Sequence, residues 1–370
     1  IPVRYSTGQI PTYKSGAADV FSPYATLNYT GLKNINTYAG TYTIRLQQDL
    51  DFLVKDLNLD IQGAYSNSSY FEETRSVMPD MYWAERRDED GNLELVHTIK
   101  KKGTTYTKDR DSQYRKYLLQ ANLTWKCMLN EQHRISALAH YEMSDSKETK
   151  DLKSDGMAAI PLRYQGLSGK VSYGFRDTYL LDFNMGYTGS ENFQKGRRFG
   201  FFPAISGGWV PTQYEFVQKA LPWLSFLKIR ASYGIVGNDA IGSGRFLYLS
   251  DINMNDSKYG ANFGYNYDYH RDGISVKRYS DPEITWEKSA KTNFALEFTL
   301  FNDLNVTAEY YTERRKSILQ QRTSIPASMG LWVQPYANLG EAKGHGVDLS
   351  LDYNKYFANK SWLQLRGNFT

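Results

Sequence analysis

The sequence predicts an all-β protein, a transmembrane antiparallel up-and-down β-barrel, and three observations favour this fold. Apolar and polar residues alternate with a period of two along many segments, which is the pattern of a strand with two different faces. Short and long connections between these segments broadly alternate, as periplasmic turns and extracellular loops do in such barrels. Aromatic residues make up 15% of the 370 residues, and barrels place amphipathic rings at both membrane interfaces.

The alternation is clearest from residue 179 to 187, where every second side chain is apolar or aromatic and Asp182, Asn184 and Gly186 lie between them. Many segments of this kind reach the ~9–11 residues with which a tilted strand crosses a bilayer. The pattern predicts about twelve strands, near residues 37–51, 57–66, 114–127, 133–143, 168–175, 178–188, 199–209, 227–236, 285–300, 304–315, 343–355 and 361–370.

The connections between these strands are of two kinds. Short ones are predicted at 128–132, 176–177, 302–303 and 357–360, and long loops near 67–113, 144–167, 237–284 and 316–342. The segment from Val210 to Phe226 should be on the side of the short turns, although Tyr214 to Leu221 could form a short helical turn before Pro222. Long loops without secondary structure are usually functional.

Composition excludes several classes of protein. Lys and Arg exceed Asp and Glu by four and form no dense basic run, so nucleic acid is not an expected partner. Mean hydropathy is −0.58, and no apolar run approaches the ~18 residues of a membrane-spanning helix, which excludes a helical membrane protein. Cys127 is the only cysteine, so the chain can form neither an internal disulfide nor a cysteine-based metal site.

No motif for catalysis, metal binding or a cofactor is present. The five histidines lack the spacing of a zinc site, and no Gly-x-Ser-x-Gly elbow or glycine-rich phosphate loop occurs. The acidic run from Asp88 to Asn92 places Gly91 wrongly for an EF-hand loop, so we interpret it as an Asp-Gly turn in an extracellular loop. We therefore expect a protein that is not an enzyme and that uses no cofactor.

Aromatic residues in the long loops are the candidates for contact with a substrate, because flat rings stack on sugar faces and on apolar peptide side chains. The alternative is that they pack within the loops or face a protein partner. The candidates are Tyr82, Trp83, Tyr265, Tyr267, Tyr269 and Trp332. Polar strand residues, including Arg45, Lys126, Arg230, Glu297 and Asp348, are expected to line the barrel interior.

Several stretches, in order and spacing, resemble the SusC-like family of TonB-dependent transporters. They are Arg198 to Trp209 (RFGFFPAISGGW), Trp223 to Gly234 (WLSFLKIRASYG), Gly237-Asn238, Ile284 to Ser289 (ITWEKS), and Asn338-Leu339-Gly340 with Gly344 to Val347 (GHGV). Pro23-Tyr24-Ala25 and Gln48 to Phe52 extend the resemblance over nearly the whole chain. The sequence departs from the family pattern at His345 and Asp348, where a basic or small residue and a Glu are expected.

The resemblance implies a barrel of about 22 strands in the outer membrane of a Gram-negative bacterium. Residues 1–370 would be an internal part of that barrel, roughly its middle half, in contact with lipid and lipopolysaccharide. The plug domain, the TonB box and the first and last barrel strands would lie outside this sequence.

The resemblance further implies active import of an oligosaccharide. A SusD-like surface lipoprotein would deliver the substrate, and TonB would act through the absent plug domain. Peptides are the second choice of substrate. Two other readings remain open at this point: a soluble all-β carbohydrate-binding or hydrolytic domain, and a complete twelve-stranded passive porin.

Overall fold

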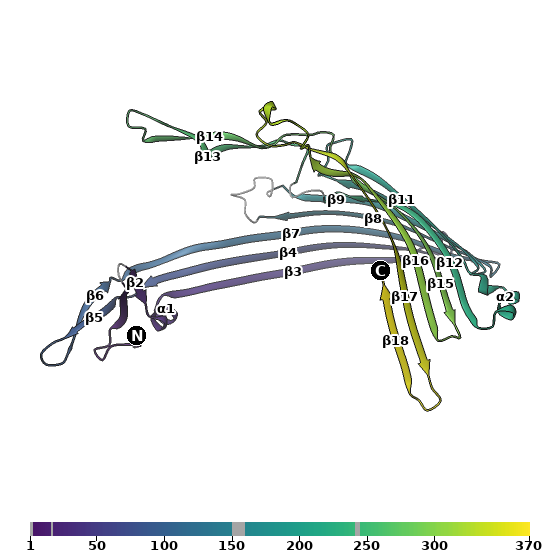
Figure 1. Cartoon of the computed structure of the whole chain (residues 1–370), viewed down its shortest axis with the longest axis horizontal. Coiled ribbons are helices and arrows are strands. Elements are labelled where there is room, and N and C mark those ends of the chain that lie inside the picture. The colour runs from purple at the N-terminus through teal and green to yellow at the C-terminus, as the bar shows by residue number, and fades with distance from the viewer. Residues whose placement is uncertain (1–2, 16–17, 150–159, 241–244) are drawn as a thin grey trace. The chain divides into compact units, whose positions relative to one another are not determined.

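The computed structural model describes residues 3–15, 18–149, 160–240 and 245–370, most of which are in strands (Figure 1). The chain divides into two compact units, the first formed by residues 1–42, 65–116 and 146–161 and the second by residues 43–64, 117–145 and 162–370. In chain order the elements are β1 (Ile10–Ser15), β2 (Ala18–Phe21), α1 (Pro23–Tyr29), β3 (Gly31–Asp49), β4 (Leu57–Met78), β5 (Met81–Arg87), β6 (Leu93–Ile99), β7 (Lys102–Leu129), β8 (His133–Glu148), β9 (Leu162–Phe175), β10 (Tyr179–Ser190), β11 (Phe199–Trp209), η2 (Pro211–Gln213), α2 (Glu215–Ala220), β12 (Leu224–Asn238), β13 (Asp251–Phe263), β14 (Tyr269–Arg278), β15 (Glu287–Leu300), β16 (Leu304–Gln321), η3 (Ala327–Met329), β17 (Tyr336–Tyr356) and β18 (Trp362–Phe369).

The largest sheet has twelve strands in the order β18-β17-β16-β15-β12-β11-β10-β9-β8-β7-β4-β3. From β9 to β18 each strand pairs antiparallel with its neighbours, which confirms the predicted antiparallel up-and-down arrangement. The edge strands β3 and β18 are not neighbours in this order. The described strands therefore form part of a barrel and do not close it.

Each of the twelve predicted strands is present, and β11 has the predicted bounds, 199–209. Other strands are longer than predicted: β4 continues to Met78, and β7 begins at Lys102. The apolar alternation is needed only where a strand crosses lipid, whereas backbone pairing can continue beyond it. The sequence pattern therefore located the alternating parts of these strands and missed their extensions.

The prediction of long loops without structure was wrong for the described residues. Residues 67–113 include β5 and β6, and residues 237–284 include the hairpin β13–β14, which is a separate two-stranded sheet (Figure 1). The strands β5 and β6 join β1 and β2 in a four-stranded sheet. Residues 150–159 and 241–244, which belong to the loops predicted at 144–167 and 237–284, are outside the described residues.

The four predicted short connections are present, and three of them are tight hairpin turns, one centred on 301–302 rather than on the predicted 302–303. The central pairs Asn130-Glu131, Arg176-Asp177 and Phe301-Asn302 all have positive φ angles, between 49° and 61°. Two successive positive φ angles are the signature of a type I′ turn, whose twist matches that of the flanking strands. Asn and Asp tolerate this conformation better than most residues other than Gly, and each of these pairs includes one of them.

The predicted helical turn between β11 and β12 is also present, as η2 followed by α2. Thr212 fixes this segment to the strand that follows, because its hydroxyl accepts a hydrogen bond from the Leu227 N–H at 3.1 Å. The Tyr214 hydroxyl donates to that of Tyr179 at 2.8 Å. Within the described ranges, every helix is too short or too polar to cross a membrane.

A buried apolar cluster lies within the second unit, at the end of its strands where the long connections lie. We call this the loop end. It consists of Phe193, Leu247, Ile284 and Trp286, with Phe202 and Leu319 packed against it. The Trp286 ring lies 5.2 Å from that of Phe193 and 5.1 Å from that of Phe202. Its indole N–H donates to the Arg198 carbonyl at 3.1 Å, so a buried polar group has its partner.

Four of the stretches that carry the family resemblance meet at this cluster, namely those that contain Phe202, Gly237, Trp286 and Asn338. The amide of Asn338 accepts from the Thr285 N–H at 2.8 Å and donates to the Thr285 carbonyl at 3.0 Å. A Cβ atom at Gly200 or Gly237 would overlap the ring of Phe202. Residues far apart in sequence thus pack together in one cluster. The small Gly residues and the large Phe and Trp rings depend on each other there.

Candidate functional site

One face of the strands β9 to β12 and β15 to β17 is apolar and uncovered, and we call it the outer face. On β10 it consists of Tyr179, Leu181, Phe183, Met185 and Tyr187, each 39–48% exposed. Neighbouring strands continue it with residues such as Ile205, Ile229, Phe294, Tyr310 and Val347. A contiguous apolar surface of this extent marks contact with a membrane or a protein partner, and its place on long antiparallel strands favours lipid.

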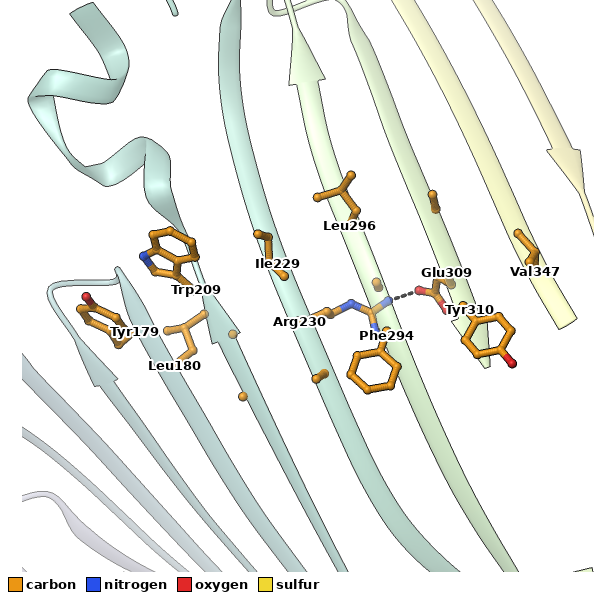
Figure 2. A pocket seen from close by; sticks show the side chains of 15 residues that line it. Tyr179, Leu180, Trp209, Ile229, Arg230, Phe294, Leu296, Glu309, Tyr310 and Val347 are labelled. Carbon is orange, nitrogen blue, oxygen red and sulfur yellow. Dashed lines mark hydrogen bonds and ion pairs between the residues drawn. The ribbon is translucent and has the colours of Figure 1, made fainter. Parts of the chain in front are cut away.

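A shallow hollow of about 810 Å³ lies over β10, β11, β12, β15 and β16 (Figure 2). On the outer face its floor is formed by Gly207 and Ala231, which are opposite each other in register. Trp209 and Phe294 belong to its apolar lining, whereas the polar lining residues Arg230 and Glu309 lie on the opposite face of the same strands. On the outer face the lining of the hollow is therefore mainly apolar, without the convergent polar groups that fix a ligand in a binding pocket.

The other face, which we call the inner face, carries a network of ion pairs centred on Arg230. Its Nε donates to Glu297 Oε1 at 2.5 Å, and its guanidinium also binds Glu309 across the intervening strand β15 (Figure 2). The amide oxygen of Asn293 accepts from Arg230 at 3.3 Å, and Lys228 Nζ is 3.6 Å from Glu297. This network bridges three strands. Its charged groups suit a water-filled barrel interior and would be unfavourable on a face in contact with lipid.

Asp348 adds a further carboxylate to the inner face. It is opposite Glu309 in the pairing of β16 with β17. Among the described residues, its Oδ1 atom is buried and has no hydrogen-bond partner. Together with Glu297 and Glu309 it gives three carboxylates for the two cations Lys228 and Arg230. The inner face is therefore locally acidic.

The predicted residues Tyr265, Tyr267 and Tyr269 lie together at the tip of the β13–β14 hairpin. They are 100%, 73% and 52% exposed, respectively. The guanidinium of Arg271 lies 4.6 Å from the centre of the Tyr269 ring, a cation–π contact that orients the ring. The tip thus presents three rings to solvent, which is the arrangement needed to contact a sugar, a peptide or a protein surface.

Trp332 belongs to the loop between β16 and β17, and it packs against the same hairpin. Its ring meets that of Tyr259 edge-on, with the centres 4.6 Å apart. Its backbone N–H donates to the hydroxyl of Tyr279 at 3.2 Å. The structure therefore brings Trp332 to the β13–β14 hairpin, where half of its surface stays exposed.

A side-chain hydrogen bond fixes the base of this hairpin, away from the tip. The hydroxyl of Ser275 donates to Asp256 Oδ2 at 2.5 Å. This hydrogen bond is the main reason that the pKa of Asp256 is lower than its usual value, because it favours the ionised carboxylate.

The predicted residues Tyr82 and Trp83 lie in β5, in the first unit. The Tyr82 ring stacks on the imidazole of His97, with the centres 4.7 Å apart. His97 is 2.8 Å from Asp80, and the pKa of Asp80 is lowered mainly by a hydrogen bond from the Lys101 N–H. Both aromatic side chains are half-buried, so part of each ring is used in packing.

The predicted turn at Asp88 to Asn92 closes the β5–β6 hairpin. Asp88 Oδ1 accepts from the Asn92 N–H at 2.7 Å, and Gly91 has a positive φ of 84°, which confirms the turn. In the part of the chain that the structure describes, no three His, Cys, Asp or Glu side chains are close enough to hold a metal ion.

Sequence reasoning singled out Arg230, Glu297 and Asp348 as interior residues but did not identify their partners. It missed Glu309, Asn293 and Lys228. Their position in the sequence could have identified them as interior residues, because each falls on the polar side of a predicted strand. Which of them meet depends on the register between strands, which one sequence does not reveal.

Comparison with known proteins gives a consistent result. The family described as TonB dependent receptor-like, beta-barrel matches residues 3–370. The TonB-dependent receptor P26 of Formosa agariphila is 25% identical over 362 residues, which cover 90% of this chain and 33% of that protein. The TonB-dependent receptor SusC of Bacteroides thetaiotaomicron is 28% identical over 211 residues, which cover 56% of this chain and 20% of that protein.

Among solved structures, the RagAB peptide importer in its closed-closed state superposes with a TM-score of 0.65. The match covers 98% of this chain and 39% of that chain at 19% identity, so it shows the fold alone. The chain spans at most about a third of the length of the curated relatives it matches. The resemblance seen in the sequence is confirmed.

Proposed function

The chain belongs to the family of TonB-dependent receptor-like β-barrels, and on this premise we propose that the protein imports a nutrient across the outer membrane of a Gram-negative bacterium. The observation that carries this proposal is the contrast between the two faces of the sheet. An uncovered apolar outer face fits lipid, and an ion-paired inner face fits an aqueous path. A catalytic activity of its own forms no part of the proposal.

We propose an oligosaccharide as the substrate and a SusD-like surface lipoprotein as the partner that delivers it. TonB would supply the energy through a plug domain. The likeness to SusC supports this assignment. The likeness to a peptide importer makes peptides the second candidate.

The aromatic residues at the loop end are the proposed substrate contacts. Tyr265, Tyr267 and Tyr269 are best placed, because they are exposed on one hairpin tip. Trp332 packs on the same hairpin and stays half exposed, and Tyr82 and Trp83 would contribute the exposed parts of their rings. Rings presented in this way stack on either sugar faces or apolar peptide side chains.

The test starts from the full-length gene. The protein is purified in detergent from outer membranes, the proteins that accompany it are identified, and binding of labelled oligosaccharides and of peptide pools is measured. Recovery from the outer membrane with a lipoprotein, together with saturable oligosaccharide binding, supports the proposal. Recovery as a soluble protein without detergent would contradict the proposal. Saturable binding of peptides, without binding of oligosaccharides, would make a peptide the substrate instead.

The aromatic contacts are tested by replacing Tyr265, Tyr267 and Tyr269 together by alanine. We expect substrate affinity to fall at least tenfold, because each ring contact contributes about 0.5–1.5 kcal/mol. The matched control is Phe216→Ala in α2, an aromatic side chain that is 69% exposed at the short-turn end. Unchanged affinity in the triple variant would remove these residues from the site.

A further inference from the structure

The outer face of β15, β16 and β17 changes from apolar to basic toward the loop end. On this face Tyr310 is opposite both Phe294 and Val347 in register, and the three side chains are 45–56% exposed (Figure 2). Residues two apart in a strand share a face, so the next side chains on this face are two threonines and a histidine. Beyond them the outer face carries four cations, namely Lys288, Arg314, Lys316 and Lys343.

The register brings these four cations together. Lys288 is opposite Lys316 in the pairing of β15 with β16, and Arg314 is opposite Lys343 in the pairing of β16 with β17. Lys316 and Lys343 are therefore diagonal neighbours, an arrangement in which the residues are about 7–8 Å apart. Like charges directly opposite each other destabilise a strand pair. An anion bound between Lys288 and Lys316 would relieve this repulsion.

One carboxylate, that of Glu341, compensates part of the charge. Arg314 Nη2 is 3.1 Å from Glu341 Oε2, and Lys316 and Lys343 interact with the same carboxylate electrostatically from farther away. Within the described residues, Lys288, Lys316 and Lys343 form no ion pair of their own. The four cations and Glu341, which we call the basic patch, therefore keep an excess of positive charge.

The basic patch lies at the level expected for lipid headgroups. Arg314 is ten residues from Leu304, where β16 begins at the short-turn end. At about 3.3–3.4 Å per residue and a tilt of about 35–45°, this length of strand rises about 25 Å along the membrane normal, which is the height of the apolar band of such barrels. Long connections in these barrels are extracellular. In the orientation that the proposed function requires, the basic patch therefore faces the headgroups of the outer leaflet.

We propose that Lys288, Lys316 and Lys343 bind a phosphate group of a lipopolysaccharide headgroup. Lipopolysaccharide forms the outer leaflet of this membrane, and its sugar headgroup joins phosphate groups to acyl chains. Ammonium groups bind phosphate as point charges, and the guanidinium of Arg314 adds planar donors beside them. This assignment rests on the proposed outer-membrane location.

The surface next to the basic patch favours a lipid over free phosphate. Phe294, Tyr310 and Val347 lie on the same face of the same strands, on the side toward the short turns. A molecule whose phosphate binds at the patch would place its acyl chains against these side chains. Free phosphate would gain nothing from this apolar surface.

The opposite face of the same strands provides a matched control. Lys291 is three residues from Lys288 on β15, but it is on the inner face, opposite Glu313. Its Nζ is 3.9 Å from Glu313, which also accepts from Arg315 Nε at 2.9 Å. Because Lys291 has a carboxylate partner and does not face lipid, it should not bind a headgroup phosphate.

The experiment uses the full-length protein purified in detergent, with purified lipid A as the probe and native mass spectrometry as the readout. The double variant Lys288→Gln with Lys316→Gln should bind phosphorylated lipid A about tenfold more weakly than the unmodified protein, and Lys343→Gln about threefold more weakly. Lys291→Gln should leave the affinity unchanged. Dephosphorylated lipid A should bind all forms equally weakly.

Three results would overturn the proposal. The first is equal binding of phosphorylated lipid A to the double variant and to the Lys291→Gln control. The second is equally tight binding of phosphorylated and dephosphorylated lipid A to the unmodified protein. The third is binding of inorganic phosphate as tight as that of phosphorylated lipid A, which would make the basic patch a site for free phosphate.

Lys316→Glu separates binding from stability. It places a carboxylate opposite Lys288, so in the absence of lipid A the protein should unfold at a higher denaturant concentration. Phosphorylated lipid A should nevertheless bind about tenfold more weakly, because the patch has lost most of its positive charge. Undiminished binding to this folded variant would contradict the proposal.

Failure of this inference is distinguishable from failure of the proposed function. A protein that imports substrate from the outer membrane but does not distinguish the two forms of lipid A refutes only the former.

Discussion

The two faces of the same strands show how one backbone adapts to two solvents. Ile205 and Ser206 are consecutive in β11, yet Ile205 extends the uncovered apolar face and Ser206 is opposite Asp182 on the polar face. On the outer face of β10 and β11, the large apolar side chains remain 39–53% exposed, which suits contact with lipid. On the inner face, charged groups pair across strands, as Arg230 does with Glu297 and Glu309.

This comparison shows that the polarity of each face, rather than the backbone pairing, distinguishes a membrane sheet from a soluble one. A soluble sandwich would bury its apolar face against a second sheet. Among the described residues of the second unit, the large apolar side chains of β10 and β11 instead remain exposed. These features agree with a barrel and oppose the soluble alternative.

The largest expected effect comes from a charge placed on the outer face. Ile205→Arg should destabilise the protein in a bilayer by about 2–4 kcal/mol, the cost of an arginine near the membrane midplane. Ser206→Arg should cost little, because the new side chain reaches the inner face near Asp182. Denaturant unfolding of both variants in lipid vesicles measures the difference. Equal destabilisation would show that the two faces were assigned wrongly.

A smaller effect is expected from removal of the centre of the inner network. Arg230→Met leaves Glu297 and Glu309 without their shared cation, and we expect a loss of about 1–3 kcal/mol in the free energy of unfolding. Adding Glu309→Gln should recover part of this loss, because the two changes affect one network.

The control for this network is Arg314→Gln, which removes an exposed ion pair with Glu341 at 3.1 Å. Such pairs contribute about 0–1 kcal/mol, so the control variant should unfold almost as the unmodified protein does. If Arg230→Met behaved like the control, the inner network would have no structural role.

The smallest effect concerns the β13–β14 hairpin, which is a separate sheet and belongs to neither face of the large one. The pKa of Asp256 is lowered in the folded hairpin, mainly by the hydrogen bond from Ser275. Its contribution to stability is therefore present above the usual Asp pKa and is lost as the pH falls through the lower folded value.

Amide hydrogen exchange in the hairpin tests this prediction. Protection factors should decrease on acidification to about pH 3, and Asp256→Asn should remove this dependence. An unchanged pH dependence in the variant would assign the effect to another group. In that case Asp256 would not stabilise the hairpin in the way that ion pairs stabilise the inner face of the large sheet.

The candidate substrate site was predictable only in part. The sequence could place Tyr265, Tyr267 and Tyr269 between strands, and aromatic residues there are plausible contacts. It could not show that they share a hairpin tip, that Trp332 packs on Tyr259 of the same hairpin, or that Tyr82 is stacked on His97. These relations depend on folding within connections that carry no membrane periodicity.

The sequence by itself determined the twelve strands of the large sheet, their antiparallel order and the polarity of each face. A strand that separates lipid from water must alternate every second residue, so the pattern is local and readable, as in residues 179 to 187. Only the tertiary structure decided which residues meet across strands. Register joins Arg230 to Glu309 and gathers Phe202, Trp286 and Gly237 at one cluster, because these contacts depend on pairing between distant segments.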